Sequence, residues 1–238
     1  MIKHHPKFEL IQAFVNGELP ASLSAGIAIH ADMCPVCQQK IAQFTDQVAE
    51  VSFEEDLDGF TADNLIFGSQ FDNKQAVDSL DNSDEIDFEQ MIAGIVQSPA
   101  EVTMPKVAKT IVLKGQTYKL PLALNNMTLS KTAHIGKLSR TRLQLNEGEI
   151  HTSLLRIEPG GGVPEHTHKG FELTVLLAGS FHDESGDYNE GDFIMLDSSH
   201  QHHPISTEGC LCYTVANDAL HFTQGINKLL NPIGSFIY

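Results

Sequence analysis

Basic residues are scarce in this chain of 238 residues. Lys and Arg together number 15 against 31 Asp and Glu, which gives a formal net charge of -16 at pH 7. A protein that binds nucleic acid directly neutralises phosphates with clustered Lys and Arg side chains. The composition therefore argues against direct nucleic-acid binding and favours a basic protein as the partner.

Long apolar runs are absent as well. No segment approaches the roughly 18 apolar residues of a membrane span. The N-terminal stretch MIKHHPKFELIQAF has neither an uninterrupted apolar core nor the small-residue cleavage site of a signal peptide. We therefore expect a cytoplasmic protein that does not enter a membrane.

The chain divides into a helical part and a β-rich part. Apolar residues recur at helical spacing in residues 8–15, 20–30, 35–51 and 84–97, and Gly17 and Pro20 separate the first two stretches. Residues 46–89 are strongly acidic, with Lys74 as the only basic residue, and the turn-rich segment 54–83 has no assigned structure. After Pro105 the pattern changes to short β-rich segments between turns, namely TIVLKG, YKLPLAL, TSLLRIEPG, ELTVLLAGSF, DFIMLD and CLCYTV.

This pattern predicts an α+β protein of two domains. Residues 1–97 form a small helical bundle stapled by zinc, residues 98–108 a linker, and residues 109–238 an antiparallel β-barrel. A helical domain this small has a limited apolar core, so a metal would add stability that packing alone does not supply.

Cysteine is rare, and two of the four cysteines stand three apart in HADMCPVC. In a reducing compartment a C-x-x-C pair is more often a metal or redox motif than a disulfide. Together with the preceding histidine, the pattern H-x-x-x-C-x-x-C supplies three ligands to a tetrahedral zinc ion: His30, Cys34 and Cys37. The fourth comes from His4 or His5, just before the first helix.

A second group of ligands follows a glycine-rich turn in GGGVPEHTHKGFE. His166 and His168 are two apart, so in a strand they face the same side, and Glu172 reaches that side from the next turn or strand. The segment SSHQHHP adds His200, His202 and His203, and period-two alternation does not choose between the first two. Three imidazoles and a carboxylate suit zinc, iron, manganese or nickel. Cys210 and Cys212, two apart on a later strand, are read as buried strand residues in preference to oxidant sensors.

An N-terminal histidine followed by HADMCPVC, on helices in front of a barrel with the cupin pattern of H-x-H and Glu, resembles the ChrR-type zinc-binding anti-sigma factors. The resemblance covers nearly the whole chain. It implies a zinc site of His5, His30, Cys34 and Cys37, with His4 as the alternative to His5. For the cupin it implies His166, His168, Glu172 and His202, the last chosen because His203 and Pro204 follow it.

The resemblance further implies a function without catalysis. An anti-sigma factor of this type sequesters an extracytoplasmic-function sigma factor and releases it under oxidative, singlet-oxygen-like stress sensed through the cupin, which also has room for a small-molecule ligand. Zinc is expected in the helical domain, and zinc or another divalent metal in the cupin. The alternative is a metal-dependent cupin enzyme, a dioxygenase or isomerase, with a structural zinc domain.

Overall fold

The computed structural model describes residues 1–55, 92–94, 96, 107–218 and 221–222. Residues Met1–Glu50 and Val107–Tyr238 form one compact unit, and Val51–Lys106 form another. The predicted acidic segment 54–83 and the predicted linker 98–108 lie almost entirely outside the described residues. The boundaries 1–97 and 109–238 therefore remain predictions.

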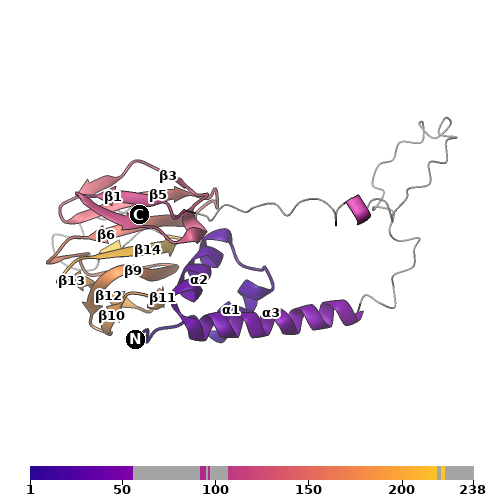
Figure 1. The fold of residues 1–238 in the computed structure, drawn as a ribbon. Helices are drawn as coiled ribbons and strands as arrows, with labels where there is room; N and C mark the ends of the chain where they lie inside the picture. The colour runs from indigo at the N-terminus through magenta and orange to yellow at the C-terminus, as the bar shows by residue number, and fades with distance from the viewer. Residues whose placement is uncertain (56–91, 95, 97–106, 219–220, 223–238) are drawn as a thin grey trace, which may run out of the picture. The chain divides into compact units, whose positions relative to one another are not determined.

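Three helices open the chain: α1 Phe8–Val15, α2 Ala21–Met33 and α3 Pro35–Glu55 (Figure 1). The prediction of three helices here is confirmed. Gly17 has a φ of 72°, the left-handed conformation that ends α1, and Pro35 occupies the first position of α3, where its missing N–H costs nothing. Of the fourth predicted helix, only residues 92–94 and 96 are described, and they are helical.

The rest of the described chain is antiparallel β-structure. The strands are β1 Thr110–Leu113, β2 Gln116–Lys119, β3 Thr128–Leu129, β4 Ala133–Ile135, β5 Leu138–Gln144, β6 His151–Ile157, β7 Gly161–Gly162, β8 His166–Thr167, β9 Phe171–Asp183, β10 Gly186–Asn189, β11 Phe193–Asp197, β12 Gln201–His202, β13 Ile205–Ser206, β14 Cys210–Ala216 and β15 His221–Phe222. The main sheet has the order β3-β5-β6-β14-β9-β13-β7, and a smaller sheet has the order β12-β8-β15. The neighbouring long strands β5, β6, β14 and β9 form one continuous wall of the sheet (Figure 1).

Strand β5 is the one long strand of this wall that the sequence pattern does not predict. Its sequence, LSRTRLQ, alternates, but Arg140 and Arg142 occupy one of its faces. Alternation with arginine on one side normally indicates a solvent-exposed face. In the structure this face turns toward a pocket, and Arg140 is among the residues that line it.

Helix α2 packs against the outer side of the same wall. Ile27 and Ile29 are fully buried, and Gly26 lies so close to Leu173 of β9 that an added Cβ would stand 2.9 Å from the leucine Cδ2. Buried positions occur around most of α2, as expected for a helix enclosed on several sides. None of the helices in the described part of the chain is long and apolar enough to cross a bilayer.

Candidate metal centres

The cupin group stands at the meeting point of three strands. His166 begins β8 and lies opposite His202 of β12 in the register, while Glu172 is the second residue of β9. His168 lies in the turn between β8 and β9. One ligand atom from each of the four predicted residues lies within 4.8 Å of every other, and all three histidines are buried.

The distances in this group suit a single metal ion. The Nε2 atom of His202 lies 2.9 Å from that of His166 and 3.4 Å from that of His168. An oxygen of Glu172 lies 2.9 Å from the His168 Nε2 and 3.4 Å from the His202 Nε2. Ligands about 2.1 Å from a metal are separated by about 3.0 Å in an octahedral arrangement and about 3.4 Å in a tetrahedral one. The four residues fit either geometry.

Contacts at the Nδ1 atoms of His166 and His202 orient these two rings, so that their Nε2 atoms face the centre. The Nδ1 of His166 lies 2.7 Å from the carbonyl oxygen of Pro164, which can only accept, so Nδ1 carries the proton and Nε2 presents its lone pair. The Nδ1 of His202 faces a carboxylate oxygen of Asp183 at 3.4 Å. Such supports behind a ligating histidine are typical of metal sites.

The pKa values of the residues in this group are shifted in different directions. Burial would raise the pKa of Glu172, but hydrogen bonds from His168 and His202 hold that pKa well below its usual range. Burial opposes protonation of His202, yet Asp183 and Glu172 raise its pKa to about 9, whereas burial and the His202 charge lower the pKa of His166 to about 3. Without a metal, the centre therefore holds an ionised carboxylate and a protonated imidazole, and a divalent cation would replace that proton.

His200, the alternative to His202, does not join the group. Its side chain is exposed and its Nδ1 lies 2.9 Å from an oxygen of Asp197. Asp197 ends β11, and His200 lies in the turn before β12. The structure thus separates two histidines that alternation places on one face, because only His202 is paired with β8.

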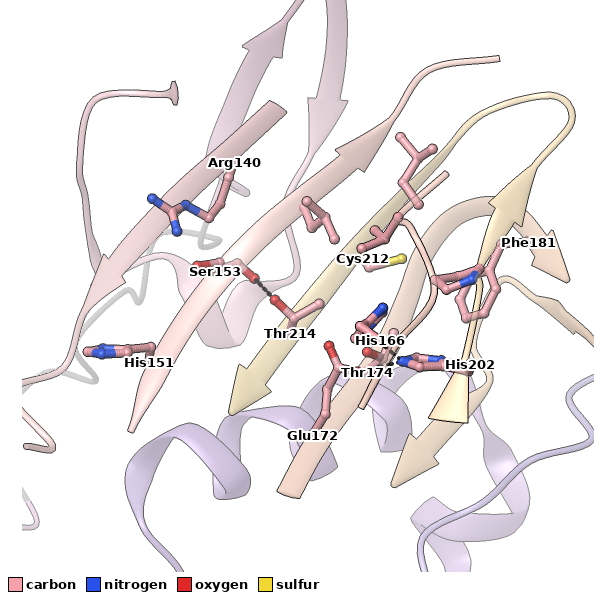
Figure 2. A pocket seen from close by; sticks show the side chains of 14 residues that line it. Arg140, His151, Ser153, His166, Glu172, Thr174, Phe181, His202, Cys212 and Thr214 are labelled. Atoms are coloured by element: carbon pink, nitrogen blue, oxygen red, sulfur yellow. Dashed lines mark hydrogen bonds and ion pairs between the residues drawn. The ribbon is translucent and has the colours of Figure 1, made fainter. Parts of the chain in front are cut away.

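A pocket opens on the cupin group and extends over the inner face of β5, β6, β14 and β9 (Figure 2). His166, Glu172 and His202 line one end, and Arg140 and His151 line the other. Cys212 also lines the pocket, with its Sγ 3.9 Å from that of Cys210, and both cysteines are buried free thiols. Neither Arg140 nor His151 is assigned to a site from the sequence.

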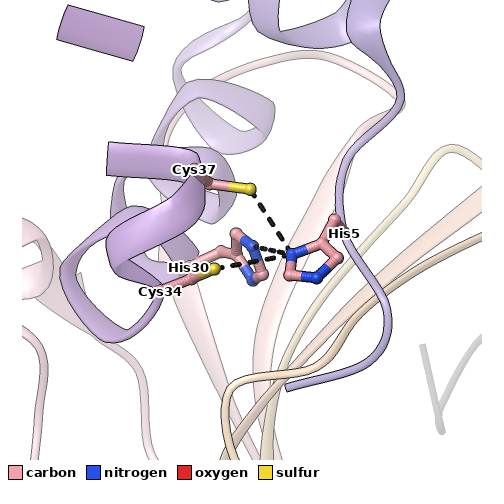
Figure 3. A group of neighbouring side chains, drawn as sticks. All are labelled: His5, His30, Cys34 and Cys37. Atoms are coloured by element: carbon pink, nitrogen blue, oxygen red, sulfur yellow. Dashed lines mark hydrogen bonds between the residues drawn. The ribbon is translucent and has the colours of Figure 1, made fainter. Parts of the chain in front are cut away.

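The N-terminal group joins the starts and ends of three helices. His5 precedes α1, His30 lies in the last turn of α2, Cys34 follows that helix, and Cys37 lies in the first turn of α3. One ligand atom from each lies within 4.8 Å of the others, and all but His5 are buried (Figure 3). The four predicted residues are therefore neighbours, although 25 residues separate His5 from His30.

The distances between the ligand atoms of this group match the edges of a tetrahedron around zinc. The Nδ1 of His5 lies 3.5 Å from the Sγ of Cys34, 3.5 Å from the Sγ of Cys37 and 3.4 Å from the Nε2 of His30. Zinc bonds of about 2.05 Å to nitrogen and about 2.3 Å to sulfur give tetrahedral edges of about 3.5 Å between N and S and about 3.4 Å between two nitrogens. Four protein ligands and no open position are typical of a structural site.

The barrel supports this group from behind. The Nδ1 of His30 lies 2.7 Å from the carbonyl oxygen of Gly191, so Nδ1 carries the proton and Nε2 faces the cysteines. One carboxylate oxygen of Asp192 accepts hydrogen bonds from the backbone N–H groups of Lys3 and His4 at 2.7 and 3.0 Å. The barrel turn at residues 191–192 thus positions both the helix that carries His30 and the N-terminal segment that carries His5.

Burial and the neighbouring thiol of Cys34 raise the pKa of the Cys37 thiol to about 11. Without a cation Cys37 is therefore protonated at neutral pH, and metal binding would release that proton. His4, the alternative to His5, lies apart from the group, with its ring 4.8 Å from that of Tyr188. The anchored backbone of His4 directs the next side chain, His5, toward the cysteines.

Comparisons with known proteins agree with the predicted resemblance. Residues 126–220 match the family described as ChrR Cupin-like domain. The anti-sigma-E factor ChrR of Cereibacter sphaeroides is 23% identical over 233 residues, 97% of each chain. A crystal structure of Rhodobacter sphaeroides SigE in complex with the anti-sigma ChrR matches 91% of this chain and 100% of that one, with 22% identity and a TM-score of 0.57. The resemblance and the predicted fold, N-terminal helices followed by an antiparallel cupin-like sheet, are confirmed.

Proposed function

We propose that this chain, which resembles the ChrR-type anti-sigma factors over nearly its whole length, is itself an anti-sigma factor that sequesters an extracytoplasmic-function sigma factor. One observation carries the proposal: the match to the anti-sigma-E factor ChrR extends over 97% of both chains and so includes helices and cupin together. A shared cupin alone would not indicate the function, because one fold hosts many activities. The enzyme alternative has no comparable support.

The proposed partner surface lies on the helices. Phe8 of α1 is 54% exposed and its ring meets that of Phe44 edge to face at 5.1 Å, while Val36 and Val48 of α3 are 55% and 41% exposed. These exposed apolar side chains of α1 and α3 are where we place the contact with the partner, since exposed apolar patches mark interaction sites. The net charge of -16 suits a partner that is basic because it binds DNA, and opposite charges speed the encounter of the two proteins.

The proposed metals differ in role. Zinc at His5, His30, Cys34 and Cys37 would cross-link the junctions of α1, α2 and α3 and so hold the partner surface in shape. Zinc or another divalent metal at His166, His168, Glu172 and His202 would make the cupin responsive to ligands or oxidants that reach the pocket. Singlet-oxygen-like stress is the proposed signal, and the cytoplasm is the proposed place of action.

The experiment is transcription in vitro by RNA polymerase with an extracytoplasmic-function sigma factor from the native host, in the presence of the full chain. The wild-type chain should inhibit, and His5→Ala should lose zinc and most of the inhibition. His4→Ala is the matched control, because its side chain lies apart from the N-terminal group. If none of the host's sigma factors of this class is inhibited or copurifies with the chain, the proposal fails.

A further inference from the structure

The end of the cupin pocket opposite the metal ligands carries a positive charge. Arg140 lines the pocket there (Figure 2). Arg142, two residues along the same strand, lies on the same face of β5. Positive charge is rare in a chain with 15 basic and 31 acidic residues. A positive charge placed inside a pocket therefore indicates that a negatively charged group binds there.

Among the residues that the structure describes, no acceptor reaches the buried Nε and Nη1 atoms of Arg140. Burial and the charge of Arg142 lower the pKa of Arg140 to about 10, which still leaves it charged at neutral pH. Buried N–H groups of a charged side chain that have no acceptor are costly, and proteins rarely keep them without a use.

Arg156 gives a contrast within the same protein. Its side chain is also buried, but its Nε donates to the hydroxyl of Tyr118 at 3.0 Å, and a second nitrogen lies 3.6 Å from the carboxylate of Glu158. It belongs to the opposite face of β6 from the pocket-lining Leu155. Among the described residues, Arg156 on the outer face thus has a hydroxyl acceptor for its Nε and a carboxylate near its guanidinium, whereas Nε and Nη1 of Arg140 on the inner face have no acceptor.

The space between the two ends sets the kind of ligand. Arg140 lies opposite Leu155, and Leu155 opposite Cys212, so three strand spacings of about 4.8 Å separate the backbones of β5 and β9. Hydroxyls of Ser153 and Thr214 and the apolar side chain of Leu155 line the middle. The cavity has a volume of about 50 Å³, which is room for several waters or one small molecule.

We propose that the cupin pocket binds a small organic carboxylate, whose carboxylate group pairs with the guanidinium of Arg140 and whose apolar body extends toward His166 and Glu172. Guanidinium and carboxylate match in charge and shape, and the pair is strong where water is excluded. This proposal rests on the proposed function, because it names the class of small molecule that the cupin would bind as the sensing part of the anti-sigma factor.

Calorimetry on the purified, metal-loaded full chain tests it, with butyrate and hexanoate as probes and butanamide and hexanamide as uncharged controls. The carboxylates should bind at least tenfold more tightly than the amides. Arg140→Met should abolish that preference, whereas Arg156→Met should retain it. Equal binding of carboxylates to wild type and Arg140→Met would mean that they bind at the metal alone, and it would overturn the proposal, as would no binding of either acid.

A second measurement does not depend on the choice of probe. In the absence of ligand, Arg140→Met should raise the midpoint of thermal unfolding by a few degrees, because it removes an uncompensated buried charge. A fall of similar size would show that Arg140 has a structural partner and would contradict the proposal. Because both measurements use the chain without a sigma factor, they fail or succeed independently of the transcription assay.

Discussion

The hydroxyl of Tyr213 donates a hydrogen bond of 2.8 Å to the carbonyl oxygen of Ser22, and it joins β14 of the barrel to the first turn of α2. Tyr213 is fully buried. Its neighbours Cys212 and Thr214 point the other way and line the cupin pocket. The strand that lines the pocket on one face therefore packs against α2 on the other.

Replacing Tyr213 by phenylalanine should weaken the junction without changing its shape. The ring keeps its packing and loses only the hydrogen bond, so we expect the free energy of unfolding to fall by about 1 kcal/mol. Urea unfolding followed by circular dichroism measures this. Unchanged stability in Tyr213→Phe would mean that the bond adds nothing.

Gly26→Val should push α2 away from the barrel. The new side chain meets Leu173, whose Cδ2 would be 2.9 Å from the added Cβ, and overpacking of this kind costs about 1–3 kcal/mol. Valine has a higher helix propensity than glycine, so a loss of stability must come from the contact. Ala21→Val, at an exposed position of the same helix, should be close to neutral in the same unfolding experiment.

His202→Ala and His200→Ala should differ in metal content although they are two residues apart. His202 faces His166, His168 and Glu172, so its loss should empty the cupin site and leave the N-terminal zinc in place. His200 pairs with Asp197 at the surface, so its loss should change neither site. Elemental analysis of the purified variants gives the number of metal ions per chain. Loss of metal from His200→Ala would show that the ligand assignment is wrong.

The Asp192 carboxylate should make the free energy of unfolding depend on pH. Burial would raise the pKa of Asp192, but hydrogen bonds from the N–H groups of Asn189, His4 and Lys3 lower it below the usual 3.8. A carboxyl with a lowered pKa in the folded state stabilises above its unfolded pKa, and that contribution disappears as the pH falls through the folded value. Asp192→Asn should therefore be less stable than wild type at pH 7, with a difference that shrinks below about pH 4.

Chemical unfolding of both proteins at several values of pH measures this difference. Zinc leaves both proteins in acid, so the quantity to compare is the gap between them and not either curve alone. A gap that stays constant from pH 7 to pH 3 would show that the Asp192 carboxylate is not what holds the N-terminal segment before α1.

Most members of the two candidate ligand groups could be predicted from sequence because their spacing is local. H-x-x-x-C-x-x-C bridges the end of one helix and the start of the next, and H-x-H with a following Glu spans the turn from β8 to β9. Spacing alone leaves the choice between His4 and His5 open, and only the family resemblance favours His5, because the contact that orients this segment comes from Asp192, nearly 190 residues away, which anchors the backbone of His4. Spacing along the chain carries no information about such a contact.

Other features were missed for a similar reason. The arginines of β5 suggest a solvent-exposed face, because nothing near them in sequence indicates that their strand closes a pocket. The apolar residues of α2 predict a buried helix, but not that Ile27 and Ile29 are buried against a barrel that begins beyond residue 106. Long-range packing decides both, and only the folded chain displays it.

Strand β9 constrains how this protein can diverge. Glu172 belongs to the metal group and the next residue, Leu173, contacts α2, so the two faces alternate along one strand. Inserting or deleting a single residue there would exchange the faces, placing leucine among the imidazoles and a carboxylate against an apolar helix. Descendants of this chain can therefore vary in length at their turns, whereas the strand that serves both faces must be inherited with its residue count unchanged.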